Sequence, residues 1–150
     1  MRWLVLVVVL AGVTPARADD DFGASALGGL VLGVSFGHRT TPLYGLEAGG
    51  GLGPERFNIG FEHRDDTRVV YAELDPWFFL GMSFGGAYEI DHDMEHVDLG
   101  AWEGLPVYSS ANSCGHAGVL GTISVGVRYT GTVELYVSPK IGYGEMPCLF

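Results

Sequence analysis

Two kinds of segment in the 150-residue chain carry residue types that serve metal or nucleophilic chemistry. The first, His-Asp-Met-Glu-His at residues 92–96, matches the H-x-x-E-H arrangement of some zinc peptidases. A peptidase needs a helix that brings both histidines to one face, whereas this segment lies in a short turn between strand-like runs. We therefore predict a solvated acidic turn without a built metal site, in which His92, Asp93 and His96 are weak candidates for cation binding.

The second is the G-x-S-x-G motif, which occurs at residues 33–37 and again at residues 81–85. In hydrolases this motif places its serine on a sharp turn between a strand and a helix. Both copies here lie inside alternating, strand-like sequence, and no helical pattern follows them. We interpret both serines as residues packed inside a sheet, and the sequence predicts a non-enzymatic protein without catalytic residues or a cofactor.

A further set of chemically capable residues consists of charges that recur on the polar side of the alternating segments. Both signs occur, so these groups can neutralise one another in a confined interior, where an unpaired charge is costly. The predicted charge network consists of Glu47, Arg56, Glu62, Arg64, Glu73, Arg128, Glu134 and Lys140.

Strands must position these residues, because the chain beyond its N-terminal segment alternates with a period of two and shows no sustained helical period. Turn-like sequences such as Gly53-Pro54-Glu55 and Asp75-Pro76 separate the alternating segments. The eight predicted strands are residues 27–37, 43–52, 56–64, 67–75, 77–90, 96–105, 117–130 and 132–143.

Each predicted strand has one bulky apolar face and one face of small, polar or charged residues. The apolar face either meets lipid or fills the core of a soluble barrel. Three patterns favour lipid: glycines on the polar face leave room inside a narrow barrel, the charges there carry both signs, and aromatic residues gather near strand ends. The predicted aromatic girdles are Phe36, Tyr44, Tyr88 and Tyr129 at one end and Phe57, Phe78 and Tyr143 at the other.

Strands of about ten residues match the tilted span of a bilayer. An open sheet edge in hydrocarbon would leave unpaired backbone amides, so the sheet must close. The predicted fold class is therefore all-β: a closed, eight-stranded, antiparallel, up-and-down transmembrane β-barrel. Side chains fill the interior of a barrel of this size.

The N-terminal segment is predicted to be a secretory signal peptide at residues 1–18, which leaves residues 19–150 as the barrel domain. A short positive start, an apolar run and Ala16-Arg17-Ala18 before an acidic stretch form this layout. A membrane-spanning helix would need about 20 apolar residues. A buried N-terminal helix is the alternative.

The charge balance excludes one class of partner. The chain has 8 Lys+Arg and 18 Asp+Glu, with a formal net charge of −10. Nucleic-acid phosphates bind Lys and Arg side chains, and acidic side chains predominate in this chain, so we predict no nucleic-acid partner.

Two cysteines, Cys114 and Cys148, lie near the C-terminal end of the sequence. Under the predicted topology, one follows the sixth strand and the other follows the eighth, so both fall at the end of the barrel that carries the termini. We predict a disulfide between them in an oxidising compartment. Two unrelated thiols are the alternative.

In this pattern, residues 19–150 resemble the small outer-membrane β-barrels of the OmpA and OmpX type. The resemblance rests on the signal-like N-terminus, the eight alternating strands, the aromatic girdles and the terminal Phe150. It implies export to a bacterial outer membrane and contact with outer-membrane lipids. It also implies contact with the barrel-assembly machinery, which reads a terminal aromatic residue.

The function predicted on these grounds is that of a non-enzymatic outer-membrane barrel with a structural or surface-interaction role. Two alternatives stay open. One is a lipid-modifying outer-membrane barrel enzyme, an activity found in some members of that superfamily. The other is a soluble periplasmic β-barrel that binds an apolar ligand in its core.

Overall fold

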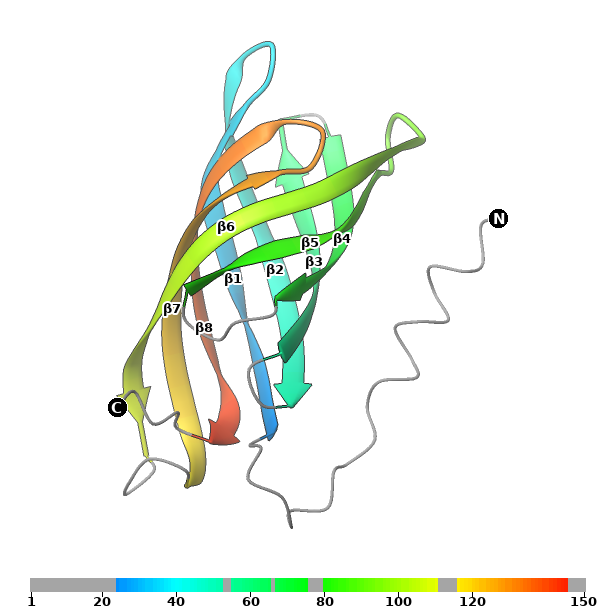
Figure 1. Cartoon of the computed structure of the whole chain (residues 1–150). Helices are drawn as coiled ribbons and strands as arrows, with labels where there is room; N and C mark the ends of the chain where they lie inside the picture. The colour runs from blue at the N-terminus through cyan, green and yellow to red at the C-terminus, as the bar shows by residue number, and fades with distance from the viewer. Residues whose placement is uncertain (1–23, 53–54, 66, 76–79, 111–115, 146–150) are drawn as a thin grey trace.

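The protein forms a closed barrel in a computed structural model that describes residues 24–52, 55–65, 67–75, 80–110 and 116–145 (Figure 1). Eight strands of the described chain follow one another around the barrel in sequence order, and β1 closes the ring by pairing with β8. Every pairing is antiparallel, so the predicted all-β, up-and-down, eight-stranded barrel is confirmed. No helix among the described residues is long and apolar enough to cross a membrane.

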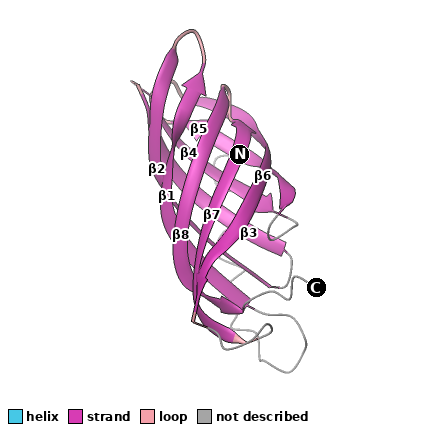
Figure 2. Ribbon diagram, turned by 90° about the vertical axis from the view of Figure 1, so that its left-hand side faces the viewer, coloured by secondary structure: helices cyan, strands magenta, loops and turns pink. Residues whose placement is uncertain are grey.

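The strands have the following bounds. They are β1 Ala24–Phe36, β2 Thr40–Leu52, β3 Glu55–Arg64, β4 Thr67–Asp75, β5 Leu80–Glu89, β6 Met94–Ser109, β7 Ala117–Tyr129 and β8 Val133–Glu145. All are tilted relative to the barrel axis and wrap around it (Figure 2).

Tight hairpins join β1 to β2, β3 to β4, β5 to β6 and β7 to β8 at one end of the barrel, the top in Figure 1. We call this the upper end, and the end at which β1 begins and β8 finishes the lower end. Backbone with positive φ occurs in three of these turns, at Asp65 (47°), Asp93 (55°) and Gly131 (94°). Asp and Gly adopt this conformation more readily than other residues, so the sequence places each turn locally.

The sixth strand departs most from the sequence prediction, because β6 runs to Ser109, beyond the predicted end at residue 105. The pairing of β6 with β7 shifts register between Pro106 and Tyr108. Proline has no amide hydrogen to donate, and a bulge lets a strand pass such a residue and continue. The connection between β6 and β7 is therefore shorter than the sequence suggested.

The two faces of the strands differ sharply in chemistry. Large apolar side chains on the outer face are exposed, as Leu46 (62%), Met82 (68%) and Ile141 (65%) illustrate. The inner face holds charged and hydroxyl side chains together with a few apolar ones, such as Val31 and Leu120. The barrel thus has an apolar exterior and a largely polar interior.

Candidate functional site

The interior of the barrel contains all eight residues of the predicted charge network. None of them is more than 9% exposed. Alternation explains this placement, because a strand with apolar residues outside must direct the intervening residues into the lumen.

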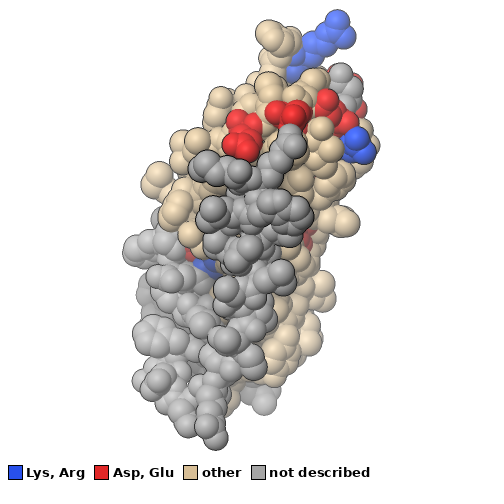
Figure 3. Space-filling view, turned by 90° about the vertical axis from the view of Figure 1, so that its right-hand side faces the viewer, with Lys and Arg blue, Asp and Glu red and all other residues tan. Residues whose placement is uncertain are grey.

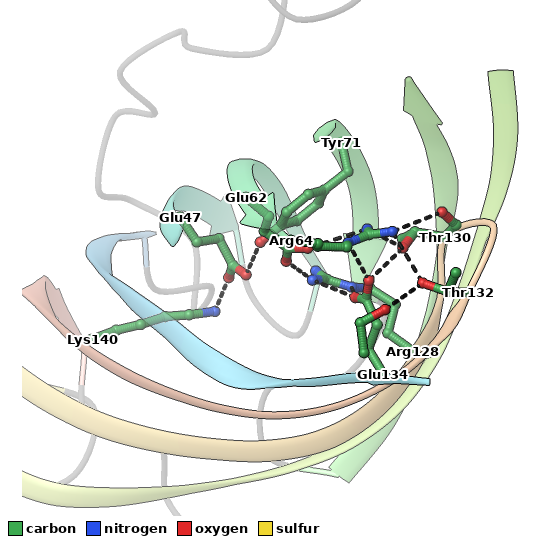
Figure 4. Close-up of polar contacts among 10 residues, drawn as sticks. Glu47, Glu62, Arg64, Tyr71, Arg128, Thr130, Thr132, Glu134 and Lys140 are labelled. Atoms are coloured by element: carbon green, nitrogen blue, oxygen red, sulfur yellow. Dashed lines mark hydrogen bonds and ion pairs between the residues drawn. The ribbon is translucent and has the colours of Figure 1, made fainter. Parts of the chain in front are cut away.

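An upper cluster of two arginines and two glutamates crosses the lumen (Figure 4). Arg64 Nε lies 2.6 Å from Glu134 Oε1, and Arg64 Nη2 lies 3.3 Å from Glu62 Oε2. Arg128 Nη2 lies 3.1 Å from Glu134 Oε2 and also forms an ion pair with Glu62. Glu62 and Arg64 come from β3, whereas Arg128 comes from β7, four strands away around the ring. These pairs therefore tie opposite walls of the barrel together.

Hydroxyl groups extend this cluster toward the upper end. Thr130 Oγ1 donates to Glu134 Oε1 at 2.9 Å, and Arg64 Nη1 donates to Thr132 Oγ1 at 3.2 Å. Thr132 in turn bonds to Ser35 Oγ at 2.7 Å. The polar groups of the β7–β8 turn are thereby connected to β1 and β3.

A second group of contacts lies beside the first. Lys140 forms an ion pair with Glu47, and Tyr71 Oη donates to Glu47 Oε2 at 2.7 Å. The Arg128 guanidinium links the two groups, because it lies 4.0 Å from the centre of the Tyr71 ring and 5.0 Å from that of Tyr136. Aromatic faces attract a cation at these distances.

Two glycines make room for these tyrosine rings. Gly60 is the register partner of Tyr71, and Gly126 is the register partner of Tyr136. A Cβ atom on Gly60 would lie 2.1 Å from Tyr71 Cζ, and one on Gly126 would lie 2.8 Å from Tyr136 Cζ. An aromatic side chain covering a cross-strand glycine is a known means of stabilising sheets.

Replacing Gly60 with alanine is expected to lower the free energy of unfolding by about 1–3 kcal/mol, because the Tyr71 ring must move and the interior is already filled. The matched control is Gly28→Ala, since a Cβ there meets nothing closer than 3.7 Å. Chemical unfolding of both variants measures the difference. Equal midpoints would contradict the placement of the Tyr71 ring over Gly60.

Arg56 and Glu73 are buried in the same interior, nearer the lower ends of β3 and β4. Three further buried polar residues were not part of the predicted charge network: Asn58, Asp75 and Asp98. Asn58 donates a hydrogen bond to Asp75. All three are in phase with the inward face of their strands, so alternation alone identifies them. The described interior has seven buried carboxylates, including Glu89, and four buried cations, a balance that disfavours anions in the lumen.

The three weak candidates for cation binding in the upper turn have different neighbours. His92 Nδ1 lies 3.4 Å from Glu89 Oε2, and His96 Nε2 lies 3.8 Å from the same oxygen. Asp93 instead accepts a hydrogen bond from the Tyr88 hydroxyl. Strand pairing thus brings Glu89 to the two histidines, and cation binding by His92, Asp93 and His96 stays a prediction. Within the described ranges, no three metal-ligating side chains are placed to hold a metal ion.

One exposed ion pair lies at the same end of the barrel. Arg68 Nη2 lies 2.6 Å from Asp91 Oδ1, and the Arg68 amide donates to Asp91 Oδ2 at 2.7 Å. These hydrogen bonds hold the pKa of Asp91 at about 2. Acidic residues gather at this upper end of the face shown in Figure 3.

The two G-x-S-x-G serines lie inside β1 and β5. Ser35 is 3% exposed and bonded to Thr132, and Ser83 is 1% exposed. The local structure is a continuous strand in each case, without the strand-to-helix turn that a nucleophile needs.

The remaining predictions fall outside the described residues. They concern the signal peptide at residues 1–18, the disulfide between Cys114 and Cys148, the girdle residue Phe78 and the terminal Phe150. Each stays a prediction.

Comparison with known proteins yields no match to a family model, to a curated protein or to a solved structure.

Proposed function

We propose that the chain is an outer-membrane β-barrel of bacteria with a non-enzymatic structural or surface-interaction role. The single observation that carries this proposal is the reversed polarity of the closed barrel. Charged side chains are buried in its interior, and large apolar side chains cover its exterior on all eight strands.

The exterior has the composition that a bilayer requires. Aliphatic side chains such as Leu32, Val125 and Leu135 are 45–48% exposed. Aromatic side chains lie toward the strand ends, with Tyr44, Tyr88 and Tyr129 at the upper end and Tyr143 at the lower. An apolar band between two aromatic girdles is typical of membrane barrels, and closure leaves no unpaired edge in hydrocarbon. In water, the same surface would be an aggregation hazard.

The interior supports a role other than that of an open pore. Ion pairs from β3 reach β7 and β8 across the lumen, and three aromatic side chains (Tyr71, Trp102 and Tyr136) are buried among them. A barrel held together in this way is rigid and presents its upper hairpins on one side of the membrane. Such a barrel suits anchoring or contact at a surface, with outer-membrane lipids and the barrel-assembly machinery as its partners.

Each alternative meets a specific difficulty. A soluble barrel for an apolar ligand needs an apolar interior, and this interior holds buried charges such as Glu62, Arg64 and Arg128. A lipid-modifying enzyme needs a serine, a histidine and an acid together at the rim. The described contacts of the rim histidines are with Glu89 and Tyr44 rather than with a serine.

Expression of the full chain in a Gram-negative host tests the proposal. We expect the protein in the outer-membrane fraction, resistant to extraction by alkaline carbonate, and migrating faster on SDS gels before boiling than after it. Protein found in the soluble periplasmic fraction would contradict the membrane assignment. A change in the lipid A mass spectrum on expression would instead favour the enzyme.

A further inference from the structure

One charged residue interrupts the apolar exterior. Glu103 on β6 is exposed and shares the outward phase of Leu99, Ala101 and Leu105 on the same strand. No other Asp, Glu, Lys or Arg among the described outward-facing residues lies between the two aromatic girdles. Arg68 and Glu95, which also point outward, lie at the upper end beside Asp91 and Tyr88.

The register places Glu103 at the middle of the apolar band. Leu99, four residues above it, pairs with Tyr129 of the upper girdle, and Tyr108 lies five residues below it, near the lower end of β6. The register partner of Glu103 on β7 is Val125, which itself pairs with Val137 on β8. On β5 the register partner of Glu103 is Leu80, so the carboxyl group has aliphatic residues beside it on both neighbouring strands.

A depression of about 570 Å³ adjoins the carboxyl group on the outer wall. Its lining residues include Leu32, Ala101, Glu103, Val125, Leu135 and Val137. Met82, the register partner of Ala101 on β5, stands at 68% exposure beside this depression. A protruding side chain and a hollow therefore lie next to each other, on either side of Ala101.

A carboxyl group in hydrocarbon needs a hydrogen-bond partner, because the lipid chains supply none. Polar residues within a membrane face partners or cavities and act as interhelical or intersubunit contacts. The described outer wall offers no cation between the girdles. A second copy of the chain does offer a matching group, since two carboxyl groups that share a proton hydrogen-bond to each other.

We propose that two copies of this chain associate in the membrane through the wall that runs from β5 to β8. Glu103 of each copy hydrogen-bonds to Glu103 of the other across a two-fold axis, and Met82 of each copy enters the depression of the other. A two-fold interface requires a surface that is complementary to itself, and the adjacent ridge and hollow meet this requirement. This inference rests on the proposed membrane location.

Sedimentation equilibrium of the full-length protein in density-matched detergent micelles tests the proposal. We expect a monomer–dimer equilibrium for the wild type and its retention in Glu103→Gln, because glutamine supplies both a donor and an acceptor. Glu103→Leu is expected to weaken dimerisation at least tenfold, and Met82→Ala to weaken it measurably. The matched control is Glu95→Leu, which removes an outward carboxylate of the same strand at the upper rim and should change nothing.

Faster migration of unboiled samples on SDS gels shows that each variant is folded, and Glu103→Leu places an aliphatic side chain on a wall that is otherwise apolar. A folded, membrane-inserted wild type that is monomeric at every detergent ratio overturns the proposal, as does a Glu103→Leu variant that dimerises like the wild type. In both cases the proposed function survives. A protein that never enters membranes overturns both.

Discussion

Replacing Arg128 with methionine is expected to lower the free energy of unfolding by about 3–5 kcal/mol, the cost of breaking a buried ion pair by removing one partner. Arg128 contacts Glu62 and Glu134 and lies over the Tyr71 ring, and all four side chains are buried. Methionine fills part of the volume but leaves the lumen with fewer cations to balance its carboxylates. Urea unfolding from lipid vesicles, followed by tryptophan fluorescence, measures the loss.

The matched control is Arg68→Met, which breaks the exposed pair with Asp91. An exposed ion pair contributes little to stability, so this variant should unfold close to the wild type. If Arg128→Met unfolded no earlier than Arg68→Met, the cross-lumen cluster would not stabilise the barrel, and the described pairing of β3 with β7 through side chains would be unimportant.

Replacing Ile59 with arginine is expected to cost about 2–4 kcal/mol of folding into a bilayer, because the side chain lies on the outer face in the middle of β3. Ile59 is 41% exposed and pairs with Ala48 and Ala72, so its neighbours on both strands are also apolar. It lies on β3, three strands away from Glu103 on β6. Folding from urea into vesicles, measured as a transition midpoint, tests this.

The same substitution at His63 provides the control, since this residue is on the same strand and face but at the upper end, beside Tyr44. The cost of a charge falls to about 0–1 kcal/mol near the interface, so His63→Arg should have a small effect. A soluble barrel would respond differently: arginine at either exposed position would be tolerated in water. Equal, small effects at both positions would therefore count against the membrane proposal.

Alternation of apolar and polar residues was sufficient to predict the number of strands, their order and the inward placement of the charges. A one-residue slip would turn every side chain of a strand to the opposite face. The alternation therefore fixes which face of each strand points inward. The turns follow the same logic, because residues such as Asp65, Asp93 and Gly131 accept positive φ locally. Strand faces and turn positions depend on residues that are close together in the sequence, so they can be predicted from the sequence.

Alternation along the strands could not predict which side chains pair across the lumen. The pairing of Arg64 with Glu134 and the position of Arg128 between two tyrosines depend on the tilt of the strands and on which walls face each other. Pairing of β5 with β6 brings Glu89, rather than Asp93, to His92 and His96. Most of these contacts join residues from different strands, and periodicity along one strand carries no information about them.

Glu103 shows the difference between what the sequence pattern predicts and what the tertiary structure adds. Its outward phase can be read from β6 alone, yet it breaks the apolar pattern, and a search for periodicity passes over the single residue that departs from it. Only the closed barrel shows that this carboxyl group lies on the apolar exterior, beside a hollow and a protruding methionine. The sequence by itself determined the barrel and the faces of its strands through local alternation, whereas the tertiary structure decided which side chains meet, because that depends on the three-dimensional closure of the sheet.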